Sequence, residues 1–589
     1  MSTIEWGGPR NISETPEEAQ QRFASFLERY DEDVSGLAEK LTTDTPLVYW
    51  SMEFYDKDEN DIKGGGGLGI LAADTRRVAE ELGIPLVVVT PFYTRESHQE
   101  LSHFFQVERQ DEAYPEKLYR RLGQVSVRTT IHTEVPVEIY DRTLGSTRII
   151  TVTEPGFGEL YPGSNSGDHR LYQEMALGFA GYQAIKNEGL NPPFMQLNEA
   201  PTVFAAVAML DDLCTDGMPF DDALEAVRKK MLYTNHTLVQ AVEGEFEKGQ
   251  FDHMIMPNLS NDSVKTWLEG LFSEENRLKL SSLAIELADT KSGVSKLHAR
   301  VSDFSDAKGD KVQFEAVTNG ISDKWIMTEA KTYLADLGVM DEYGLPTNDY
   351  AQRLESLSMD EVRHIRSLGR QEMNEVLATR KDQYGNPIAI PESATVFDFK
   401  RRFARYKRPD MIFDDPTRLA ALLEEHDAHF VLTGKPHPMD EEMKGELTRL
   451  LQTIDENDTL RARVHYVQDY DEQVGRALSV GADCAINVPV VGQEACGTSF
   501  MKDIANFKVL ISTADGGVAD VEPIACLEVE DDEINSLYEK VDEAARIVRD
   551  DEHYRQLLMH QLKGYAPVFS GARMMGQYME LFARLDATR

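Results

Sequence analysis

Short runs of apolar and β-branched residues alternate along the chain with longer stretches of helical periodicity. In the first half, such runs predict strands at residues 47–54, 85–92, 194–197, 230–234 and 313–318. In the second half, they predict strands at residues 395–399, 429–433, 464–467, 484–488 and 508–512. Apolar strands separated by helices are typical of parallel sheets that helices cover. The pattern therefore predicts an α/β fold.

The remaining segments define the expected domain organisation. Residues 124–153 alternate apolar and polar positions, which predicts antiparallel hairpins inserted in the first domain. Residues 325–383 are predicted to be mostly helical, and the methionine and aromatic stripe at 571–585 is typical of a packing helix. A chain of 589 residues is too long for one core. We expect two Rossmann-like domains, 1–322 and 323–589, with a final helix able to pack back on the first.

The charge balance excludes some partners. Acidic residues number 102 and basic residues 61, a net charge of −41 before histidine is counted. A field of this sign repels nucleic acid and anionic membranes. Excess surface carboxylate keeps a protein hydrated, so a salt-rich cytoplasm is one hypothesis; the alternative is an unusually acidic mesophilic enzyme.

Cysteine usage and the N-terminus point to a cytoplasmic protein. The four cysteines lie far apart without a C-x-x-C pair, so neither a disulfide framework nor a zinc site is predicted, and we expect no metal. No basic region followed by an apolar run opens the chain, and no window approaches about 18 uninterrupted apolar residues. We therefore expect a soluble, cytoplasmic protein.

The strongest chemical signal lies at residues 494–502. This segment follows a predicted buried strand and opens a predicted helix, with Thr498 or Ser499 as its N-cap. On such a helix Thr498 and Lys502 share one face. Backbone N–H groups at a helix start can hold a phosphate, and a lysine four residues on can reach an aldehyde on the same ligand. The spacing suits pyridoxal phosphate; a solvated lysine in an ordinary strand–loop–helix unit is the alternative.

A second signal is a cluster of cations in this acidic chain. Six of nine residues are basic in the run Lys400-Arg401-Arg402-Phe403-Ala404-Arg405-Tyr406-Lys407-Arg408. The run follows a predicted strand and ends at Pro409, a residue suited to the first turn of a helix. Arginine forks bind phosphate oxygens in pairs. The run is therefore a candidate anion site, and a basic surface patch that balances nearby carboxylates is the alternative.

A third signal is the glycine-rich run at residues 64–69, after the first predicted strand. Gly64, Gly66 and Gly69 satisfy the G-x-G-x-x-G pattern of dinucleotide sites. However, no acidic residue follows the next strand to take a ribose hydroxyl. A glycine loop also lets backbone N–H groups approach other phosphates.

These blocks resemble signatures of the α-glucan (glycogen, starch or maltodextrin) phosphorylases, and they occur along the chain in the same order as in that family. Residues 494–502 resemble the cofactor-lysine signature E-A-S-G-T-x-x-M-K, and residues 401–408 resemble the block K-R-x-x-x-Y-K-R. The N-domain signature is matched by Tyr49-x-Ser51-x-Glu53-Phe54 with Gly66-Gly67-Leu68-Gly69. The resemblance runs from about Pro46 to the last helix. It implies the GT-B fold, with two Rossmann-like domains facing across a catalytic cleft.

The resemblance also implies roles for individual residues. Pyridoxal 5'-phosphate would be bound to Lys502, and the groups around it would be Gly66, Gly67, Arg401, Tyr470, Gly497 and Thr498. Arg402 and Lys407 would bind the substrate phosphate. His236, in the block T-N-H-T, would join these three as the catalytic set, although a single histidine after a strand is usually structural. Further substrate contacts would be Glu53, Glu199, Asn319 of the block T-N-G-I, Tyr406, Glu494, Ala495 and Cys496.

Three positions depart from the family pattern. Cys496 replaces the usual serine of the cofactor block, and Phe500 is bulky where small or polar residues are common. Pro201 replaces the histidine of an L-N-[DE]-x-H block, which puts contacts to the glucan chain in doubt.

The function implied is phosphorolysis of an α-1,4-glucan from its non-reducing end, releasing α-D-glucose 1-phosphate. The expected partners are the glucan and inorganic phosphate, without nucleic acid or membrane. Family members are commonly dimers, so a homo-oligomer is a further expectation. One alternative is a GT-B glycosyltransferase that uses a nucleotide sugar, with Lys502 and the basic run on the diphosphate. The other is a catalytically retired glycan-binding protein, suggested by the three departures.

Overall fold

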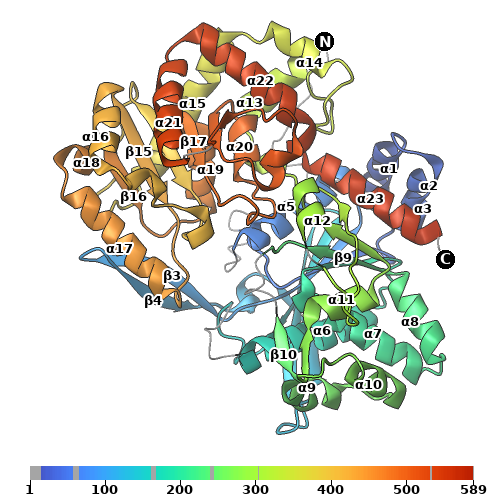
Figure 1. The fold of residues 1–589 in the computed structure, drawn as a ribbon. Coiled ribbons are helices and arrows are strands. Elements are labelled where there is room, and N and C mark those ends of the chain that lie inside the picture. Colours follow the sequence, from blue (N-terminus) through green and yellow to red (C-terminus); the bar gives the residue numbers. More distant parts are fainter. Residues whose placement is uncertain are drawn as a thin grey trace. The chain divides into compact units, whose positions relative to one another are not determined.

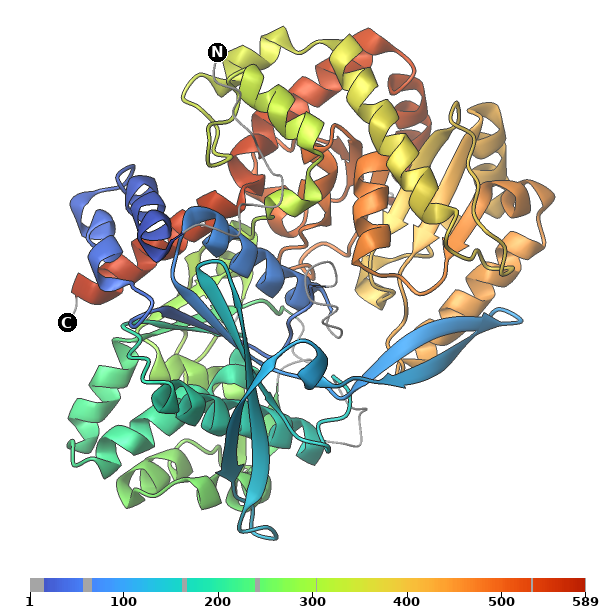
Figure 2. The same ribbon diagram turned by 180° about the vertical axis from the view of Figure 1, so that it is seen from behind.

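The computed structural model describes residues 15–56, 66–160, 167–238, 244–302, 304–530 and 533–587. The described backbone divides into two compact units, each treated by itself (Figures 1 and 2). The N-terminal unit comprises residues 15–96, 112–317 and 574–587 within these ranges. The C-terminal unit comprises residues 97–111 and 318–573.

A nine-stranded sheet forms the centre of the N-terminal unit, in the order β13-β12-β9-β8-β1-β2-β7-β6-β5. Neighbouring strands are parallel from β13 to β7 and antiparallel from β7 to β5. The strands are β1 (Leu47–Ser51), β2 (Leu86–Pro91), β5 (Arg120–Val127), β6 (Val135–Leu144), β7 (Thr147–Thr153), β8 (Met195–Asn198), β9 (Met231–Asn235), β12 (Thr290–Gly293) and β13 (Glu315–Ala316). The antiparallel strands predicted at residues 124–153 are confirmed as β5, β6 and β7.

Helices pack around this sheet, and a short ribbon of β10 (Glu245–Glu247) and β11 (Arg277–Lys279) lies apart from it. They are α1 (Pro16–Leu27), α2 (Glu32–Ser35), α3 (Leu37–Lys40), α5 (Gly67–Leu82), α6 (Gly167–Asn187), α7 (Phe204–Thr215), α8 (Phe220–Arg228), α9 (Lys248–Met254), α10 (Asp262–Glu269), α11 (Leu280–Leu287) and α12 (Lys296–Val301). The last helix, α23 (Gly571–Ala587), contributes its residues from 574 onward. There Phe582 packs on Phe194, with ring centroids 5.1 Å apart.

Two glycines allow helix α6 to approach its neighbours closely. A Cβ at Gly178 would lie 2.4 Å from the Cβ of Phe204, at the start of α7. A Cβ at Gly181 would lie 2.7 Å from the ring of Trp50 on β1. At these two positions the backbone of α6 packs directly on Phe204 and Trp50. Helix α6 therefore packs without gaps in the buried apolar core that it shares with α7 and the sheet.

A six-stranded parallel sheet forms the centre of the C-terminal unit, in the order β16-β15-β14-β17-β18-β19. Its strands are β14 (Thr395–Lys400), β15 (Ala428–Thr433), β16 (Val464–Val467), β17 (Cys484–Asn487), β18 (Val509–Ser512) and β19 (Leu527–Glu528). Counted along the chain, this is the strand order 3-2-1-4-5-6 of doubly wound nucleotide-binding folds. The five strands predicted in the second half are confirmed.

Helices pack around this sheet (Figure 1). They are α13 (Thr328–Asp336), α14 (Tyr350–Arg353), α15 (Met359–Leu377), α16 (Pro416–Glu425), α17 (Glu441–Asp455), α18 (Asp458–Arg463), α19 (Glu472–Gly481), α20 (Ser499–Ala505), α21 (Glu533–Ile547) and α22 (Asp551–Phe569). A two-stranded hairpin, β3 (Arg95–Ser102) and β4 (Phe105–Glu112), completes the unit with its residues 97–111. Among the described helices, none is both long enough and apolar enough to span a bilayer.

Candidate functional site

The order of strands in the C-terminal unit marks where a ligand should bind. The strand after β14 lies on one side of it and the strand after β17 on the other, and in doubly wound folds the ligand-binding crevice lies beyond the carboxyl ends of the strands at such a switch point. The basic run begins at the end of β14, and the segment 488–498 follows β17. The fold thus brings two of the predicted signature blocks to the same edge of the sheet.

A buried carboxylate between two cations forms the centre of this crevice. Glu494 Oε2 lies 2.6 Å from Arg401 Nη2 and 3.4 Å from Lys407 Nζ. The side chains of Glu494, Arg401 and Lys407 are 10%, 4% and 13% exposed. Among the described residues, no group accepts a hydrogen bond from the buried Arg401 Nη1. The cluster carries an excess positive charge and an unused donor, which are the properties of an anion site.

The charges of this cluster shift one another's pKa values. Burial raises the pKa of Glu494, but Arg401 and Lys407 outweigh it and hold that pKa at about 2. Burial and then the charge of Arg401 lower the pKa of Lys407 to about 7, although Glu494 acts in the opposite direction. Glu494 is therefore ionised throughout the neutral range, whereas Lys407 can gain or lose its proton there.

The loop that carries Glu494 is held in place by Asp515. Its Oδ2 accepts hydrogen bonds from the backbone N–H groups of Glu494 and Gln493, at 2.9 and 3.2 Å. At Gly497, an added Cβ would lie 2.7 Å from Arg401 Nη2 and 3.0 Å from Glu494 Oε1. Glycine is needed there because the ion pair packs directly against the backbone.

Lys502 lies buried on α20, where its ammonium group faces an indole ring. Its Nζ lies 3.1 Å from the ring centroid of Trp325, a cation–π contact. Asn506 donates to the carbonyls of Lys502 and of Trp325, both at 2.8 Å, and so ties the two segments together. Sequence reasoning missed Trp325 and Asn506, because neither carries a motif and their contacts join distant parts of the chain.

Four buried charges lie on β14, on α20 next to Lys502 in the sequence, and just before β18. We call Asp398, Lys400, Asp503 and Lys508 the charge quartet. Lys508 Nζ lies 2.9 Å from Asp398 and 2.7 Å from Asp503. Lys400 Nζ lies 3.1 Å from Asp398 and also contacts Asp503. No side chain of the quartet is more than 5% exposed. Of the four, only Lys400 belongs to a run that the sequence singled out for its chemistry.

Other predicted residues of the C-terminal unit lie around the crevice with differing burial. Asn319 Nδ2 donates to the carbonyl of Cys496 at 3.0 Å, and its buried Oδ1 meets no donor among the described residues. Tyr406 has its pKa raised to about 12, by burial and then by Glu494. Arg402 is exposed and hydrogen-bonds Tyr406. The remaining positions are Thr498, the N-cap of α20 without a side-chain cap hydrogen bond, the buried Ala495, and the half-buried Tyr470.

The predicted residues of the N-terminal unit follow adjacent parallel strands. Glu199 comes after β8 and His236 after β9. Glu199 Oε1 accepts hydrogen bonds from the backbone N–H of His236 at 2.6 Å and from the Thr237 hydroxyl at 2.8 Å. Glu199 thereby holds the histidine loop. Burial and then His298 lower the pKa of His236 to about 3, so the ring is neutral, and its Nε2 has no partner among the described residues.

Glu53, after β1, holds the start of the glycine helix. Its Oε2 accepts hydrogen bonds from the backbone N–H groups of Gly66 and Gly69, the latter at 3.2 Å. Gly67 opens α5, and nothing lies within 4 Å of where its Cβ would be. Gly64 lies outside the described residues. Within the N-terminal unit, predicted substrate and phosphate groups therefore occupy the carboxyl ends of neighbouring strands.

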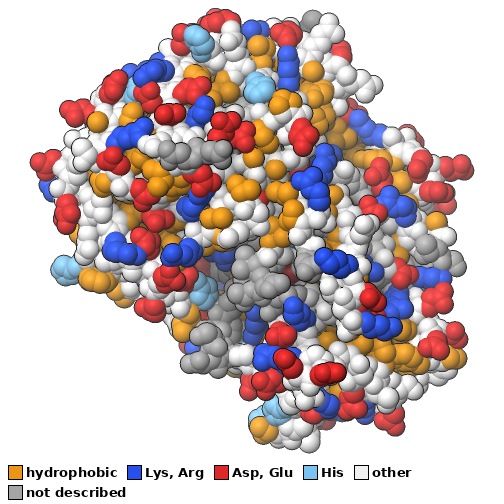
Figure 3. Space-filling view, in the orientation of Figure 1, with side chains coloured by type: hydrophobic (Ala, Val, Ile, Leu, Met, Phe, Trp, Pro, Cys, Tyr) orange, Lys and Arg blue, Asp and Glu red, His pale blue; other side chains and the backbone are white. Residues whose placement is uncertain are grey.

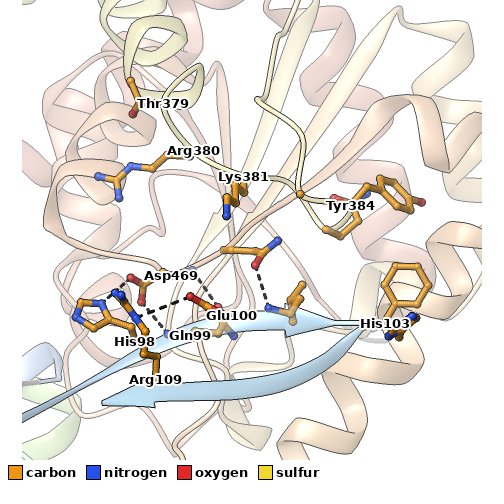
Figure 4. Close-up of a pocket in the computed structure, with 15 residues that line it drawn as sticks. His98, Gln99, Glu100, His103, Arg109, Thr379, Arg380, Lys381, Tyr384 and Asp469 are labelled. Atoms are coloured by element: carbon orange, nitrogen blue, oxygen red, sulfur yellow. Dashed lines mark hydrogen bonds and ion pairs between the residues drawn. The ribbon is translucent and has the colours of Figure 1, made fainter. Parts of the chain in front are cut away.

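A cavity of about 520 Å³ lies between the β3–β4 hairpin and the segment 379–385 (Figure 4). Its polar groups are largely engaged with one another. Asp469 accepts from His98 at 2.9 Å and from the backbone N–H of Gln99 at 3.0 Å, and Arg380 pairs with Asp471 at 2.9 Å. The cavity thus marks where the hairpin docks on the C-terminal unit, and it contains none of the predicted site residues.

The crevice of the C-terminal unit fits pyridoxal phosphate in its donor set. The cofactor needs a buried lysine for its aldehyde and donors for its phosphate. Lys502 supplies the first. Arg401 Nη1, which has no acceptor among the described residues, is a donor for the phosphate, and the glycine at 497 lets Arg401 lie against the backbone.

Comparisons with known proteins show which family the chain resembles. The carbohydrate phosphorylase family model matches residues 248–567. The chain is 27% identical to the maltodextrin phosphorylase of Thermococcus litoralis, over 91% of this chain and 70% of that protein. It is 26% identical to the glycogen phosphorylase of Mycobacterium tuberculosis, with the same coverage of both chains. It is 24% identical to the glycogen phosphorylase of Aquifex aeolicus, over 91% of this chain and 86% of that one.

The family match includes the residues that form the crevice. It extends over 320 of the 589 residues, more than half of the chain. Within it lie the basic run, the loop of Glu494 and the buried Lys502. The chain therefore belongs to the carbohydrate phosphorylase family.

Proposed function

We propose that this protein is a glycosyltransferase that phosphorolyses α-1,4-glucans such as glycogen, starch or maltodextrin from the non-reducing end. The product is α-D-glucose 1-phosphate. The observation that carries the proposal is the Arg401–Glu494–Lys407 cluster, which lies at the carboxyl ends of β14 and β17 in a member of this family. An excess of buried cations around one carboxylate suits inorganic phosphate as co-substrate.

The proposed cofactor is pyridoxal 5'-phosphate, held by Lys502. When bound, it supplies a phosphate group that can exchange a proton with the substrate phosphate. Thr498, Gly497 and Arg401 would hold that group, and Trp325 would shield the lysine from water. Tyr470, Gly66 and Gly67 are proposed as further contacts.

The residues of the chain then position the substrates. Lys407 and Arg402 would hold the attacking phosphate near the positive charge that develops on the sugar. Glu494, ionised at neutral pH, would accept hydrogen bonds from glucosyl hydroxyls. The neutral His236 and Asn319 each have a ring or amide atom available for the sugar. No pair of carboxylates is needed as general acid and base, unlike in ordinary glycosidases.

The finer expectations follow from family membership. We propose the GT-B arrangement of two Rossmann-like domains, with residues of both units serving one reaction. Glu53, Glu199, Ala495, Cys496 and Tyr406 remain proposed substrate contacts. The domain boundary at residue 322, a homo-oligomer and a cytoplasmic location remain predictions.

An absorption spectrum and an activity assay test the proposal together. The purified protein should show a near-ultraviolet band that borohydride changes, and maltodextrin plus phosphate should yield glucose 1-phosphate. Lys502→Ala should lose the cofactor, while Lys540→Ala, a lysine on α21, should keep it. A colourless protein that transfers sugar from a nucleotide sugar would favour the alternative glycosyltransferase. A protein that binds glucan without forming product would favour the glycan-binding alternative.

A further inference from the structure

The charge quartet joins the two segments that carry the proposed cofactor and phosphate groups. Lys400 directly precedes Arg401 at the end of β14, and Asp503 directly follows Lys502 on α20. Lys508, just before β18, contacts both carboxylates of the quartet. The four side chains therefore connect β14, α20 and the start of β18 through charge–charge contacts.

The quartet is neutral as a whole and strongly ionised within. Two carboxylates and two ammonium groups leave no net charge, and each carboxylate contacts both ammonium groups. Burial acts to raise the pKa of Asp503, but the charges of Lys400 and Lys508 outweigh it and hold that pKa below its ordinary value. Removing one member would leave an unpaired charge almost without access to water, which is strongly unfavourable.

Charges of the quartet act on a neighbouring group. Burial is the main cause of the raised pKa of Tyr470, and the charges of Lys400, Asp471, Glu472 and Asp398 follow in that order. The other charged groups in this region form their own pairs. Arg401 pairs with Glu494, and Lys324, which precedes Trp325, pairs with Glu472 at 2.5 Å. Asp503 is the residue after Lys502 and both are buried, so a net charge on the quartet would act on Lys502 through a poorly screened interior.

We infer that the charge quartet is a positioning device, which fixes the place and the electrostatic environment of Lys502 relative to Arg401. The inference rests on the proposed function of Lys502 as the cofactor lysine. Hydrophobic side chains of similar volume would hold β14 and α20 together at least as well. The charges also fix the relative position of the segments, which hydrophobic side chains would not do. Each carboxylate meets both ammonium groups in only one arrangement of β14, α20 and the start of β18.

Two single variants give the quartet opposite net charges. Asp503→Asn leaves one positive charge, and Lys508→Gln leaves one negative charge. With pyridoxal phosphate bound, the pH titration of its absorption band reports the proton on the Lys502 nitrogen. We expect the first variant to lower the midpoint and the second to raise it. Each shift should be about one pH unit, the size expected for one added charge in a partly screened interior. The double variant should return the midpoint close to that of the wild type.

A matched control separates this role from general stability. Asp141, on β6 of the N-terminal unit, is also a buried carboxylate between two cations, Arg120 at 2.9 Å and Arg148 at 2.8 Å. Asp141→Asn should lower the thermal midpoint of unfolding without moving the absorption midpoint. Asp398→Asn changes the quartet's charge as Asp503→Asn does, and Lys400→Gln changes it as Lys508→Gln does. If one of the first two variants does not fold, its counterpart is used instead.

Shifts of the same sign in the positive and negative variants, or no shift in either, would overturn the inference. A wild-type protein that binds no pyridoxal phosphate would instead contradict the proposed function, before any variant is compared.

Discussion

At the scale of single residues, Lys407 is the group whose protonation should govern phosphate binding near neutral pH. Its pKa is lowered to about 7 by burial and then by Arg401. Because the pKa is lowered, the cation is present below about pH 7 and is lost as the pH rises through that value. We expect the KM for phosphate to rise above pH 7, by up to about tenfold per pH unit. Steady-state kinetics between about pH 6 and 8.5 would measure this.

Lys407→Arg is the control for that profile, since arginine keeps its charge over the whole range. Titration of phosphate itself affects both proteins equally. The KM of the variant should therefore lack the rise seen in the wild type. If both proteins show the same pH dependence, Lys407 is not the titrating group.

Gly497 allows a second prediction at this scale. A methyl group there would meet Arg401 Nη2 at 2.7 Å and Glu494 Oε1 at 3.0 Å, so the ion pair must move. We expect Gly497→Ala to weaken binding of pyridoxal phosphate at least about tenfold, the loss of roughly one charge-assisted hydrogen bond. Titration of the apoprotein with pyridoxal phosphate, followed by absorbance, would measure this. Gly445→Ala, on α17 with nothing within 4 Å, should leave binding unchanged and stabilise the helix by up to about 1 kcal/mol.

The residues of the crevice differ in how far the sequence could predict them. Lys502, Glu494, Arg401 and Lys407 lie in short blocks whose spacing carries their chemistry. The charge quartet could not be found in this way, because its members come from three segments that only the sheet brings together. Trp325 was likewise missed, since a lone tryptophan gives no sign of which distant lysine it will meet.

At the scale of elements, burial decided which strands the sequence could predict. The central strands of both sheets are continuous apolar runs and were found at nearly their observed bounds. Strand β12 was missed because its four residues, Thr290–Gly293, include no large apolar side chain. The β3–β4 hairpin was missed because both strands are mostly polar and exposed. Its turn also lacks the Asn-Gly pair that usually signals a tight hairpin. His103 and Phe104 take the positive φ values there instead, 50° and 69°.

The docking of this hairpin gives a prediction at the same scale. Burial acts to raise the pKa of Asp469, but Lys435 and His98 hold it at about 2. Because the pKa of Asp469 is lowered, the stability that its carboxylate adds to the docked hairpin is complete above about pH 4. That stability is lost as the pH falls toward about 2. Asp469→Asn should imitate that loss at neutral pH. Hydrogen exchange should then be faster at the backbone N–H groups of Gln99 and Leu101, which meet Asp469 and Gln468.

A hairpin that stays equally protected in the Asn variant would show that its other contacts suffice. Gln106 to the carbonyl of Pro436 at 3.3 Å, and Glu108 to Lys444 at 3.2 Å, are the candidates. Glu446→Gln, on α17 but outside these contacts, serves as the control and should leave the exchange rates unchanged.

At the scale of the whole molecule, the net charge of −41 contrasts with the cationic crevice. Acidic side chains are spread over the visible face rather than gathered in one patch (Figure 3). Mutual repulsion among so many carboxylates opposes the compact state. Salt shortens the range of that repulsion, from about 10 Å at 0.1 M to about 3 Å at 1 M. The protein should therefore become more stable as salt is added.

We expect the thermal midpoint of unfolding to rise steadily as KCl is increased from about 0.1 M to above 1 M, where screening of surface charge is nearly complete. Sucrose at matched osmolality is the control, because it favours compact states without screening charge. A larger rise in KCl than in sucrose would support adaptation to a salt-rich cytoplasm. A midpoint that does not respond to KCl would exclude it. The same salt should weaken binding of the substrate phosphate, which we place at the exposed Arg402. It should weaken binding of the cofactor phosphate at the buried Arg401 less.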